Sequence, residues 1–265
     1  MKISIYTSLF NVDNGMFDIF NALKNWNKYA DEIIVGTIPC QKDRVKEILY
    51  DNNPVRGVPI RISSMDTTLE DPLFDGKLKE GALRGCKNKI VIQQDLDERI
   101  GGEIYQWEGL FSFLSRNDDF KAFMLPVIDL YKDLDHYKGL GAKWYLHHKD
   151  GCHRGPVAFA KRGDGTIDTE KSDTCELIDE QGNLASFLRD DRFTLSTVMD
   201  RFNIIMPHII HLGYLDLDKR VENNKFWGPV WTARNGKTVK VATTVSSVEE
   251  ENQAIPHGIK REWWK

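Results

Sequence analysis

Strand-like and helix-like hydrophobic patterns alternate through the first hundred residues. Short apolar runs predict buried strands, and apolar residues spaced three and four apart predict amphipathic helices. In chain order, the predicted elements are a strand at Ile3–Ser8, a helix at Asn14–Tyr29, a strand at Asp31–Thr37, a helix at Asp43–Tyr50, a strand at Pro59–Ser63, a helix at Asp75–Cys86 and a strand at Ile90–Ile92. This order predicts an α/β protein with a mostly parallel sheet flanked by helices.

The pattern becomes less regular after residue 100. The elements predicted there are a helix at Gly102–Arg116, strands at Ala122–Tyr131, Lys143–Leu146 and Val157–Ala160, an irregular surface segment at Asp164–Asn183, helices at Leu184–Asp190 and Asp216–Phe226, an apolar segment at Ile209–Leu212, and a strand containing Val239, Val241 and Val245. No linker rich in glycine, proline or serine separates the parts of the chain. We therefore expect a single domain over residues 1–265, with residues 1–100 and 101–265 as its two halves.

Composition narrows the class of protein. The 265 residues are 41% hydrophobic with a formal net charge of -4, which gives no global electrostatic case for a nucleic-acid binder. No run approaches the roughly 18 apolar residues of a membrane span. The segment Met1–Tyr6 predicts a first strand rather than a signal peptide. Four widely spaced cysteines without a Cys-x-x-Cys pair predict reduced thiols in a cytoplasmic protein.

An Asp-Leu-Asp triplet directly follows the strand at Ile90–Ile92. Ligands of open α/β sheets bind beyond the carboxyl ends of the strands, so Asp95 and Asp97 are expected at such a site. Hard divalent cations take carboxylate and phosphate oxygens, so the two acids could hold a metal ion against a phosphate group. The alternative is a solvated turn that caps the next helix.

Several segments of the first hundred residues together resemble one known family. Ile3–Asn11 is similar to a first strand with its nucleotide-contacting turn, Asp31–Val35 to a second strand, and Lys79–Leu83 followed by Asp95–Glu98 to a central signature. They resemble the nucleotide-diphospho-sugar transferase domain of GT-A (Rossmann-like) glycosyltransferases, in particular family 2. The chain departs from that pattern at Gly36–Cys40, where the family commonly has an acidic residue and a Ser/Thr-rich turn.

The resemblance implies a metal-dependent hexosyl- or pentosyltransferase, with Mn²⁺ or Mg²⁺ and a nucleotide-sugar donor, UDP-sugars being expected first. It implies that Asp97 is the direct metal ligand and that Asp95 binds the ribose, or the metal through water. Lys79, where the family often has arginine, would lie near the diphosphate, and Asp66 and Thr7 would line the nucleobase pocket. The alternatives are a solvated helix residue for Lys79 and a helix N-cap for Asp66.

A histidine in the second half resembles another part of the family's site. His211 precedes Gly213 and Tyr214, as in a family segment where a histidine near a Gly–aromatic pair completes the metal shell. The resemblance therefore implies His211 as a metal ligand, with His208 as the second choice. The two lie on opposite sides of an extended segment, so both are not expected to bind one ion. A hydrogen-bonded structural histidine is the alternative for His211.

The half after residue 100 is the expected acceptor-binding side. We interpret the segment Trp144–Arg154 as lying beside the acceptor, with Trp144 stacking on a sugar or base, and His153 and Arg154 contacting phosphate or hydroxyl groups. Trp144 is equally consistent with a core residue. A zinc site built from His147, His148, Cys152, His153 and Cys175 fits no standard spacing.

An inverting transferase also needs a carboxylate base to deprotonate the acceptor hydroxyl. The candidates are Asp150, Glu176, Asp190 and Asp191, of which Asp150 is preferred. Cations next to Asp191 would lower its pKa and weaken it as a base. The sequence leaves open whether the reaction inverts or retains stereochemistry.

The acceptor and the reaction class also stay open. The acceptor could be a saccharide, a lipid-linked glycan, a small metabolite or DNA. A phage-type enzyme acting on hydroxymethylated bases is allowed by the basic, aromatic tail, which contains Lys237, Lys240, Lys260, Arg261, Trp263 and Trp264. A nucleotidyltransferase would need a glycine-rich, basic phosphate loop, which Leu9–Gly15 does not provide. A non-catalytic nucleotide-sugar or glycan binder is the third class.

Overall fold

The computed structural model describes residues 2–12, 18–51, 53–55, 57–116, 122–134, 136–149, 153–154, 177–178, 207–235, 238–251 and 255–256. Within these ranges it gives only the course of the backbone at 122–124, 137–145, 153–154, 177–178, 234–235, 250–251 and 255–256.

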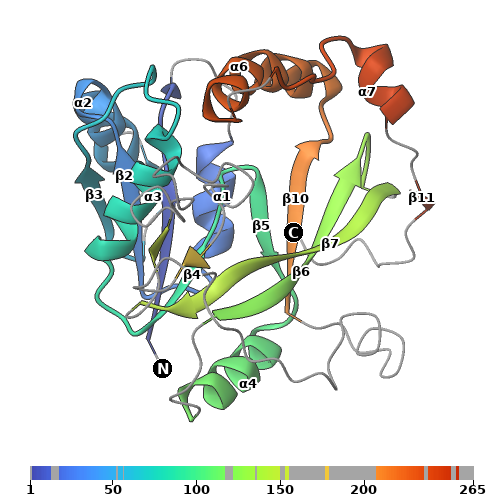
Figure 1. Cartoon of the computed structure of the whole chain (residues 1–265). Coiled ribbons are helices and arrows are strands. Elements are labelled where there is room, and N and C mark those ends of the chain that lie inside the picture. The colour runs from blue at the N-terminus through green and yellow to red at the C-terminus, as the bar shows by residue number, and fades with distance from the viewer. Residues whose placement is uncertain are drawn as a thin grey trace, which may run out of the picture.

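Helices and strands alternate from β1 to β4, whereas most of the elements after α4 are strands (Figure 1). The helices are α1 (Ile19–Trp26), η2 (Pro39–Gln41), α2 (Lys42–Lys46), η3 (Glu47–Asp51), α3 (Phe74–Gly85), α4 (Ile104–Ser115), α6 (Leu217–Asn235) and α7 (Val245–Glu251). The strands are β1 (Ile3–Ser8), β2 (Glu32–Thr37), β3 (Ile60–Ser64), β4 (Ile90–Gln93), β5 (Glu98–Gly101), β6 (Ala122–Tyr131), β7 (His136–His148), β8 (His153–Arg154), β9 (Leu177–Ile178), β10 (His208–Tyr214) and β11 (Ile255–Pro256).

Nine of these strands form one sheet, in the order β3-β2-β1-β4-β7-β6-β10-β5, with β11 added to β7. Parallel pairing joins β3, β2, β1 and β4, and it also joins β6 and β10. Within this sheet only β5 and β7 run against the common direction. The predicted α/β class with a mostly parallel, helix-flanked sheet is therefore confirmed. Strands β8 and β9 pair separately.

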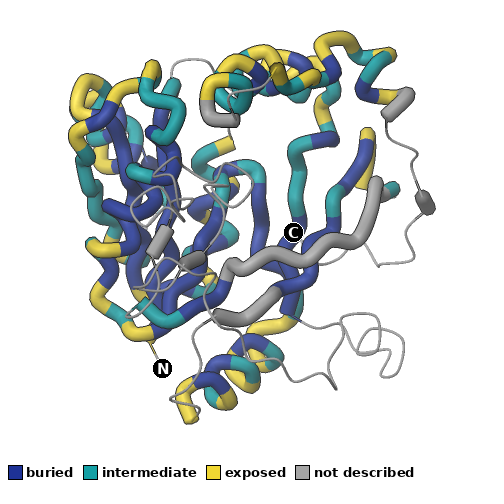
Figure 2. The backbone as a smooth tube through the Cα atoms, in the orientation of Figure 1, coloured by how far each residue is buried: buried dark blue, intermediate teal, exposed yellow. Residues whose placement is uncertain are grey.

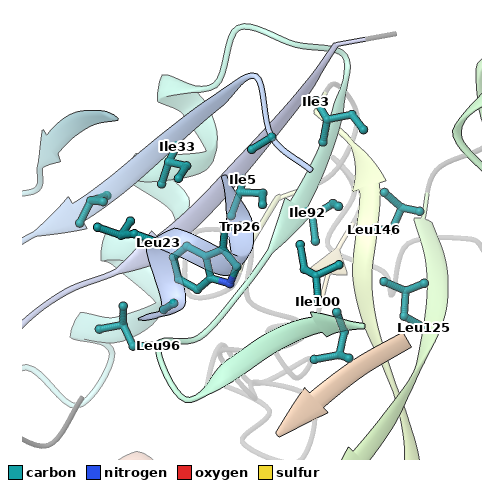
Figure 3. Close-up of a cluster of buried hydrophobic side chains, with 14 of the residues drawn as sticks. Ile3, Ile5, Leu23, Trp26, Ile33, Ile92, Leu96, Ile100, Leu125 and Leu146 are labelled. Carbon is teal, nitrogen blue, oxygen red and sulfur yellow. The ribbon is translucent and has the colours of Figure 1, made fainter. Parts of the chain in front are cut away.

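Helices cover both faces of the parallel half of the sheet. Side chains alternate along a strand, so Ile3 and Ile5 of β1 pack on one face against Trp26 of α1 (Figure 3). Tyr6 points to the other face and packs against Ala82 of α3. Strands β1, β2 and β4 are buried along their whole length, as expected for parallel strands covered on both sides (Figure 2).

Helix α6 lies across the end of the sheet toward which β10 points (Figure 1). Its Trp227 stacks on Phe74 at the start of α3, with ring centroids 5.7 Å apart and planes 10° apart. Its Phe226 stacks on Phe10, just after β1, at 6.0 Å. These rings bring the C-terminal part of the chain to the carboxyl ends of the first strands, where a ligand site of an α/β sheet is expected.

Each strand and helix predicted in the first hundred residues has a counterpart. Two predictions for the second half are wrong in extent or type. Strand β7 is much longer than Lys143–Leu146, because it pairs with both β4 and β6. Val245 begins a helix instead of continuing a strand with Val239 and Val241, because the Thr244 hydroxyl caps that helix by accepting a hydrogen bond from the Ser247 amide at 3.2 Å.

Other predictions for the second half have mixed outcomes. The predicted strand Val157–Ala160, the helix Leu184–Asp190 and most of Asp164–Asn183 lie outside the described residues. The helix predicted at Asp216–Phe226 is present and extends to Asn235. No described helix combines the length and apolar composition that crossing a bilayer requires.

Two glycines give a matched test of the packing of the sheet against α3. A Cβ built on Gly36 of β2 would overlap the backbone carbonyl of Leu78 in α3, whereas a Cβ on Gly109 of α4 would meet nothing within 4 Å. We expect Gly36→Ala to destabilise the protein by at least about 2 kcal/mol. Gly109→Ala should instead stabilise it by about 0.5–1 kcal/mol, because alanine is the better helix former. Urea unfolding of both variants measures the difference, and equal effects would contradict the close approach of α3 to β2.

Candidate functional site

The Asp-Leu-Asp triplet forms a tight turn between β4 and β5. Its middle residue, Leu96, is buried in the same core cluster as Trp26 (Figure 3). Glu98 is fully buried, and its Oε2 accepts the Asp95 amide hydrogen bond at 2.8 Å. Burial of Leu96 leaves Asp95 and Asp97 at the surface of the turn, where both are part-exposed. The turn leads into a strand, so the helix-capping alternative for this triplet is wrong.

Asp97, His211 and Asp129 form a chain of polar contacts across three segments. His211 Nε2 lies 3.2 Å from Asp97 Oδ2, and His211 Nδ1 lies 2.6 Å from Asp129 Oδ1. Strand pairing produces this arrangement, because His211 on β10 is in register with Asp129 on β6 on one side and with Glu98 on β5 on the other. The Leu212 amide also donates to the Asp97 carbonyl at 2.8 Å, which fixes the turn against β10.

The two carboxylates control the charge of His211. Burial opposes a charged ring, but the Asp97 charge and the hydrogen bonds with Asp129 and Asp97 outweigh it and raise the pKa of His211 to about 10. Gly213 makes room for this pair, since a Cβ there would lie 2.7 Å from His211 Nε2 and 3.1 Å from Asp97 Oδ2. A side chain at position 213 would thus occupy the space directly beside both groups.

Asp97 and His211 fit two positions of a divalent metal site. Two ligand atoms at right angles around a six-coordinate ion, with bonds of about 2.1 Å, lie about 3.0 Å apart. The observed distance between Asp97 Oδ2 and His211 Nε2 is 3.2 Å. Donation from Nδ1–H to Asp129 would leave Nε2 as the acceptor, as is usual for metal-binding histidines. No group of three or more His, Cys, Asp or Glu side chains in the described ranges is arranged to hold an ion. Water and a bound phosphate would therefore have to supply the other ligands.

Lys79 connects Asp95 to a second buried carboxylate. Its ammonium group lies 2.9 Å from Asp95 Oδ1 and 3.0 Å from Asp75 Oδ2, and only 3% of its side chain is exposed. Asp75 also accepts a hydrogen bond from the Ser8 hydroxyl at 2.6 Å, which ties α3 to the end of β1. The solvated-helix alternative for Lys79 is therefore wrong. Because the Lys79 ammonium group pairs with both Asp75 and Asp95, it orients Asp95. The same two ion pairs leave it less free to contact a diphosphate.

Thr7 and Asp66 occupy different environments at the ends of the first strands. Thr7 is 1% exposed, and its hydroxyl donates to the Ser8 carbonyl at 3.3 Å. Asp66 is exposed just beyond β3. The next helix, α3, has Leu73 at its N-cap, so the N-cap alternative for Asp66 is wrong. Contact of either residue with a nucleobase stays a prediction.

His208 and His147 both have buried, structural surroundings. His208 is buried next to Gly101, three residues from His211 along β10, and does not take part in the Asp97 contact. His147 is fully buried, with Nε2 2.7 Å from the Tyr6 hydroxyl. A zinc site at His147 is therefore not supported, and Cys152 and Cys175 lie outside the described residues.

Most residues predicted for the acceptor side lie outside the described side chains. Asp150, the predicted base, and its alternatives Glu176, Asp190 and Asp191 lie outside the described residues. For Trp144, in β7, and for His153 and Arg154, in β8, the structure gives the backbone alone.

Two residues of the site, Asp129 and Asp75, were not found from the sequence, and the spatial role of Gly213 was not foreseen. Asp129 is the single charged residue of the apolar strand β6, which was a usable signal for a buried functional acid. Asp75 lies four residues before Lys79 on α3, a spacing at which the two side chains meet. Gly213 was noted only as part of the segment that follows His211. The close approach around it could not be predicted, because the crowding atoms come from its own strand and from the distant Asp97 turn.

Comparisons with known proteins find partial similarities to solved structures. No protein-family model and no curated protein matches the sequence. S. aureus TarS 1–349 in complex with UDP-GlcNAc matches at 20% identity over 49% of this chain and 34% of that chain, with a TM-score of 0.33. The 4-diphosphocytidyl-2C-methyl-D-erythritol synthase of Anaerococcus prevotii matches at 16% identity, over 56% of this chain and 71% of that chain, with a TM-score of 0.34. HddC of Yersinia pseudotuberculosis matches at 15% identity, over 56% of this chain and 71% of that chain, with a TM-score of 0.31.

The match covers about a third of the length of TarS 1–349. Similarities of this size do not assign the chain to a family.

Proposed function

We propose that this protein is a metal-dependent glycosyltransferase that moves a sugar from a nucleotide diphosphate, with UDP-sugars as the first candidates, to a hydroxyl acceptor. The observation that carries the proposal is the contact between Asp97 Oδ2 and His211 Nε2, backed by Asp129, at the end of a mostly parallel sheet. The family resemblance implied Asp97 and His211 separately as metal ligands. Although 114 positions separate them, their side chains are in contact.

Each residue has a role in this proposal. Asp97 and His211 would hold Mn²⁺ or Mg²⁺, and Asp129 keeps the imidazole ring in place. A divalent ion supplies Lewis-acid stabilisation of the charge that develops on the departing diphosphate. Lys79 fixes one oxygen of Asp95, so that the other can accept a hydrogen bond from a ribose hydroxyl. Thr7 and Asp66 would line the nucleobase pocket.

The acceptor side of the proposal follows from the sequence. Trp144, His153 and Arg154 are proposed to bind the acceptor, and Asp150 to deprotonate its hydroxyl group. A base near the acceptor oxygen contributes to the rate by accepting a proton as the new glycosidic bond forms.

One observation disfavours the nucleotidyltransferase alternative. The segment after β1 begins with Leu9 and Phe10, which are 1% and 5% exposed. Phe10 packs against Phe74 and α6, so this part of the segment builds core rather than a phosphate-binding loop. The DNA-acting variant rests on the tail, of which residues 252–254 and 257–265 lie outside the described ranges.

A panel of nucleotides and nucleotide sugars, each with manganese or with EDTA, tests the proposal. Thermal shift should show stabilisation by UDP with manganese, since a ligand at a hundred times its Kd adds about 2.7 kcal/mol. Release of UDP from a UDP-sugar without acceptor then separates an enzyme from a binding protein. The absence of any nucleotide-dependent shift would contradict the proposal, and binding without UDP release would favour the non-catalytic class.

Metal binding should depend on pH through His211. Metal ions bind neutral imidazole, so below the pKa of about 10 the ion must displace a proton from His211. We expect manganese affinity to rise about tenfold per pH unit between about pH 6.5 and 8.5, with about one proton released per ion. Calorimetry in buffers of different ionisation enthalpy measures that proton. Asp129→Asn should weaken the dependence of manganese affinity on pH, because it removes a carboxylate that raises the pKa of His211. A manganese affinity that does not change with pH would contradict displacement of a proton from His211.

A further inference from the structure

A cavity of about 150 Å³ opens beside Asp97 on the side of α1 and α6. Its wall includes Asp97 and Gly213, so whatever occupies it would lie next to the Asp97–His211 pair. Leu96, Leu212 and Leu215 give it an apolar part. The volume is below the roughly 300–1,000 Å³ of sites that enclose drug-sized ligands, so the cavity suits one small chemical unit.

Three cationic side chains line this cavity: Arg99, Lys219 and Arg220. Arg99 is 7% exposed and lies on β5, with hydrogen bonds to the Leu96 and Glu98 carbonyls. Arg220 bonds the Tyr214 hydroxyl at 3.0 Å and stacks over that ring at 4.3 Å. For the Lys219 side chain, no hydrogen bond or ion pair is found with the described part of the chain. Lys219 is therefore able to receive a ligand.

The acids around the cavity are already engaged. Asp97 contacts His211, Asp18 accepts hydrogen bonds from Asn21 and lies 4.0 Å from Arg99, and Asp216 accepts the Lys219 amide at 3.1 Å. The other acids on the first turns of α6, Asp218 and Glu222, are not among the lining residues. At the start of this helix, Lys219 and Arg220 therefore line the cavity together with one acid, Asp216, whose Oδ1 already accepts the Lys219 amide.

The position of Lys219 and Arg220 on α6 is electrostatically unfavourable for the helix itself. They lie in the first turn of a 19-residue helix, where the macrodipole disfavours positive charge and favours anions. An anion in the cavity would reverse that cost, because it would interact with both side chains and with the positive end of the helix.

We propose that this cavity binds an anionic group, phosphate or carboxylate, carried by the hydroxyl acceptor. The nucleoside side of the site lies at the ends of β1, β3 and β4, marked by Ser8, Asp66 and Asp95, whereas the cavity lies beyond Asp97 toward Asp18 and α6. In this arrangement a donor bound at those strand ends and a ligand in the cavity would reach Asp97 from different directions. The identification of the ligand as the acceptor rests on the proposed function, while anion binding at the cavity does not.

Saturation-transfer NMR with glucose 6-phosphate and glucose, in EDTA and without a nucleotide, tests the site independently of turnover. Glucose 6-phosphate should bind at least about tenfold more tightly than glucose. Lys219→Gln should weaken the binding of glucose 6-phosphate about tenfold, because the loss of one hydrogen bond to a charged group changes an affinity by about that factor. Lys225→Gln is the matched control, because Lys225 is exposed on the same helix but does not line the cavity. It should change the affinity less than twofold. Arg220→Gln, checked for folding by circular dichroism, serves as a second variant.

Three outcomes would overturn the inference. Equal binding of glucose and glucose 6-phosphate would remove the anion subsite, as would unchanged binding in both Lys219→Gln and Arg220→Gln. Displacement of glucose 6-phosphate by UDP would mean that the donor diphosphate occupies the cavity, and so would overturn the acceptor assignment. If the protein binds glucose 6-phosphate specifically but binds neither UDP nor manganese, the result would support the anion subsite and contradict only the proposed function.

Discussion

Replacing Asp97 by Asn is expected to abolish manganese-dependent binding of UDP and to lower the rate of UDP release from a UDP-sugar about 10³-fold. The amide keeps the shape of the side chain but lacks the charge that holds a divalent ion. His211 would keep its contact with Asp129, 2.6 Å away, so the fold around β10 should persist. Calorimetric titration with UDP in the presence of manganese, together with initial rates of UDP release, measures both effects.

Asp43→Asn is the matched control for that experiment. Asp43 lies on α2 and forms an exposed ion pair with Lys46, so both binding and rate should equal those of the wild type. Turnover of the Asp97→Asn variant within tenfold of the wild type would show that Asp97 does not hold a catalytic ion.

Replacing Lys79 by Met is expected to destabilise the protein by about 3–5 kcal/mol. The variant would leave Asp75, 5% exposed, and Asp95 without the cation that lies between them. Asp95 would also lose its fixed orientation, so UDP affinity should fall together with stability. Urea unfolding measures the stability and calorimetry the affinity.

Lys77 on the same helix provides the control for Lys79. It pairs with Asp71, but 38% of its side chain is exposed, so Lys77→Met should cost no more than about 1 kcal/mol. The double variant Lys79→Met with Asp75→Asn should lose less stability than Lys79→Met alone, because it removes one of the two uncompensated charges. Equal losses for Lys77→Met and Lys79→Met would show that the buried cation is not what holds Asp75 and Asp95 together.

Local patterns were sufficient for the first half of the fold. Buried parallel strands are continuous apolar runs, and their flanking helices repeat with a 3.6-residue period, so both are visible in short windows of sequence. The second half was harder because its strands pair over long distances. β7 contacts both β4 and β6. Strand β5, at the boundary between the halves, was also not predicted, because it follows the Asp-Leu-Asp turn without an apolar run of its own.

The sequence by itself determined the α/β class and the acidic pair Asp95 and Asp97 after a buried strand, and its resemblance to a known family added Lys79 and His211. The tertiary structure alone decided how they meet. The pairing of β10 with β5 and β6 places His211 between Asp97 and Asp129, and the packing of α3 places Lys79 between Asp75 and Asp95. The reason is physical: a residue type reports its own chemistry, whereas the pKa of His211 and the partner of Lys79 depend on charges contributed by segments far away in the chain.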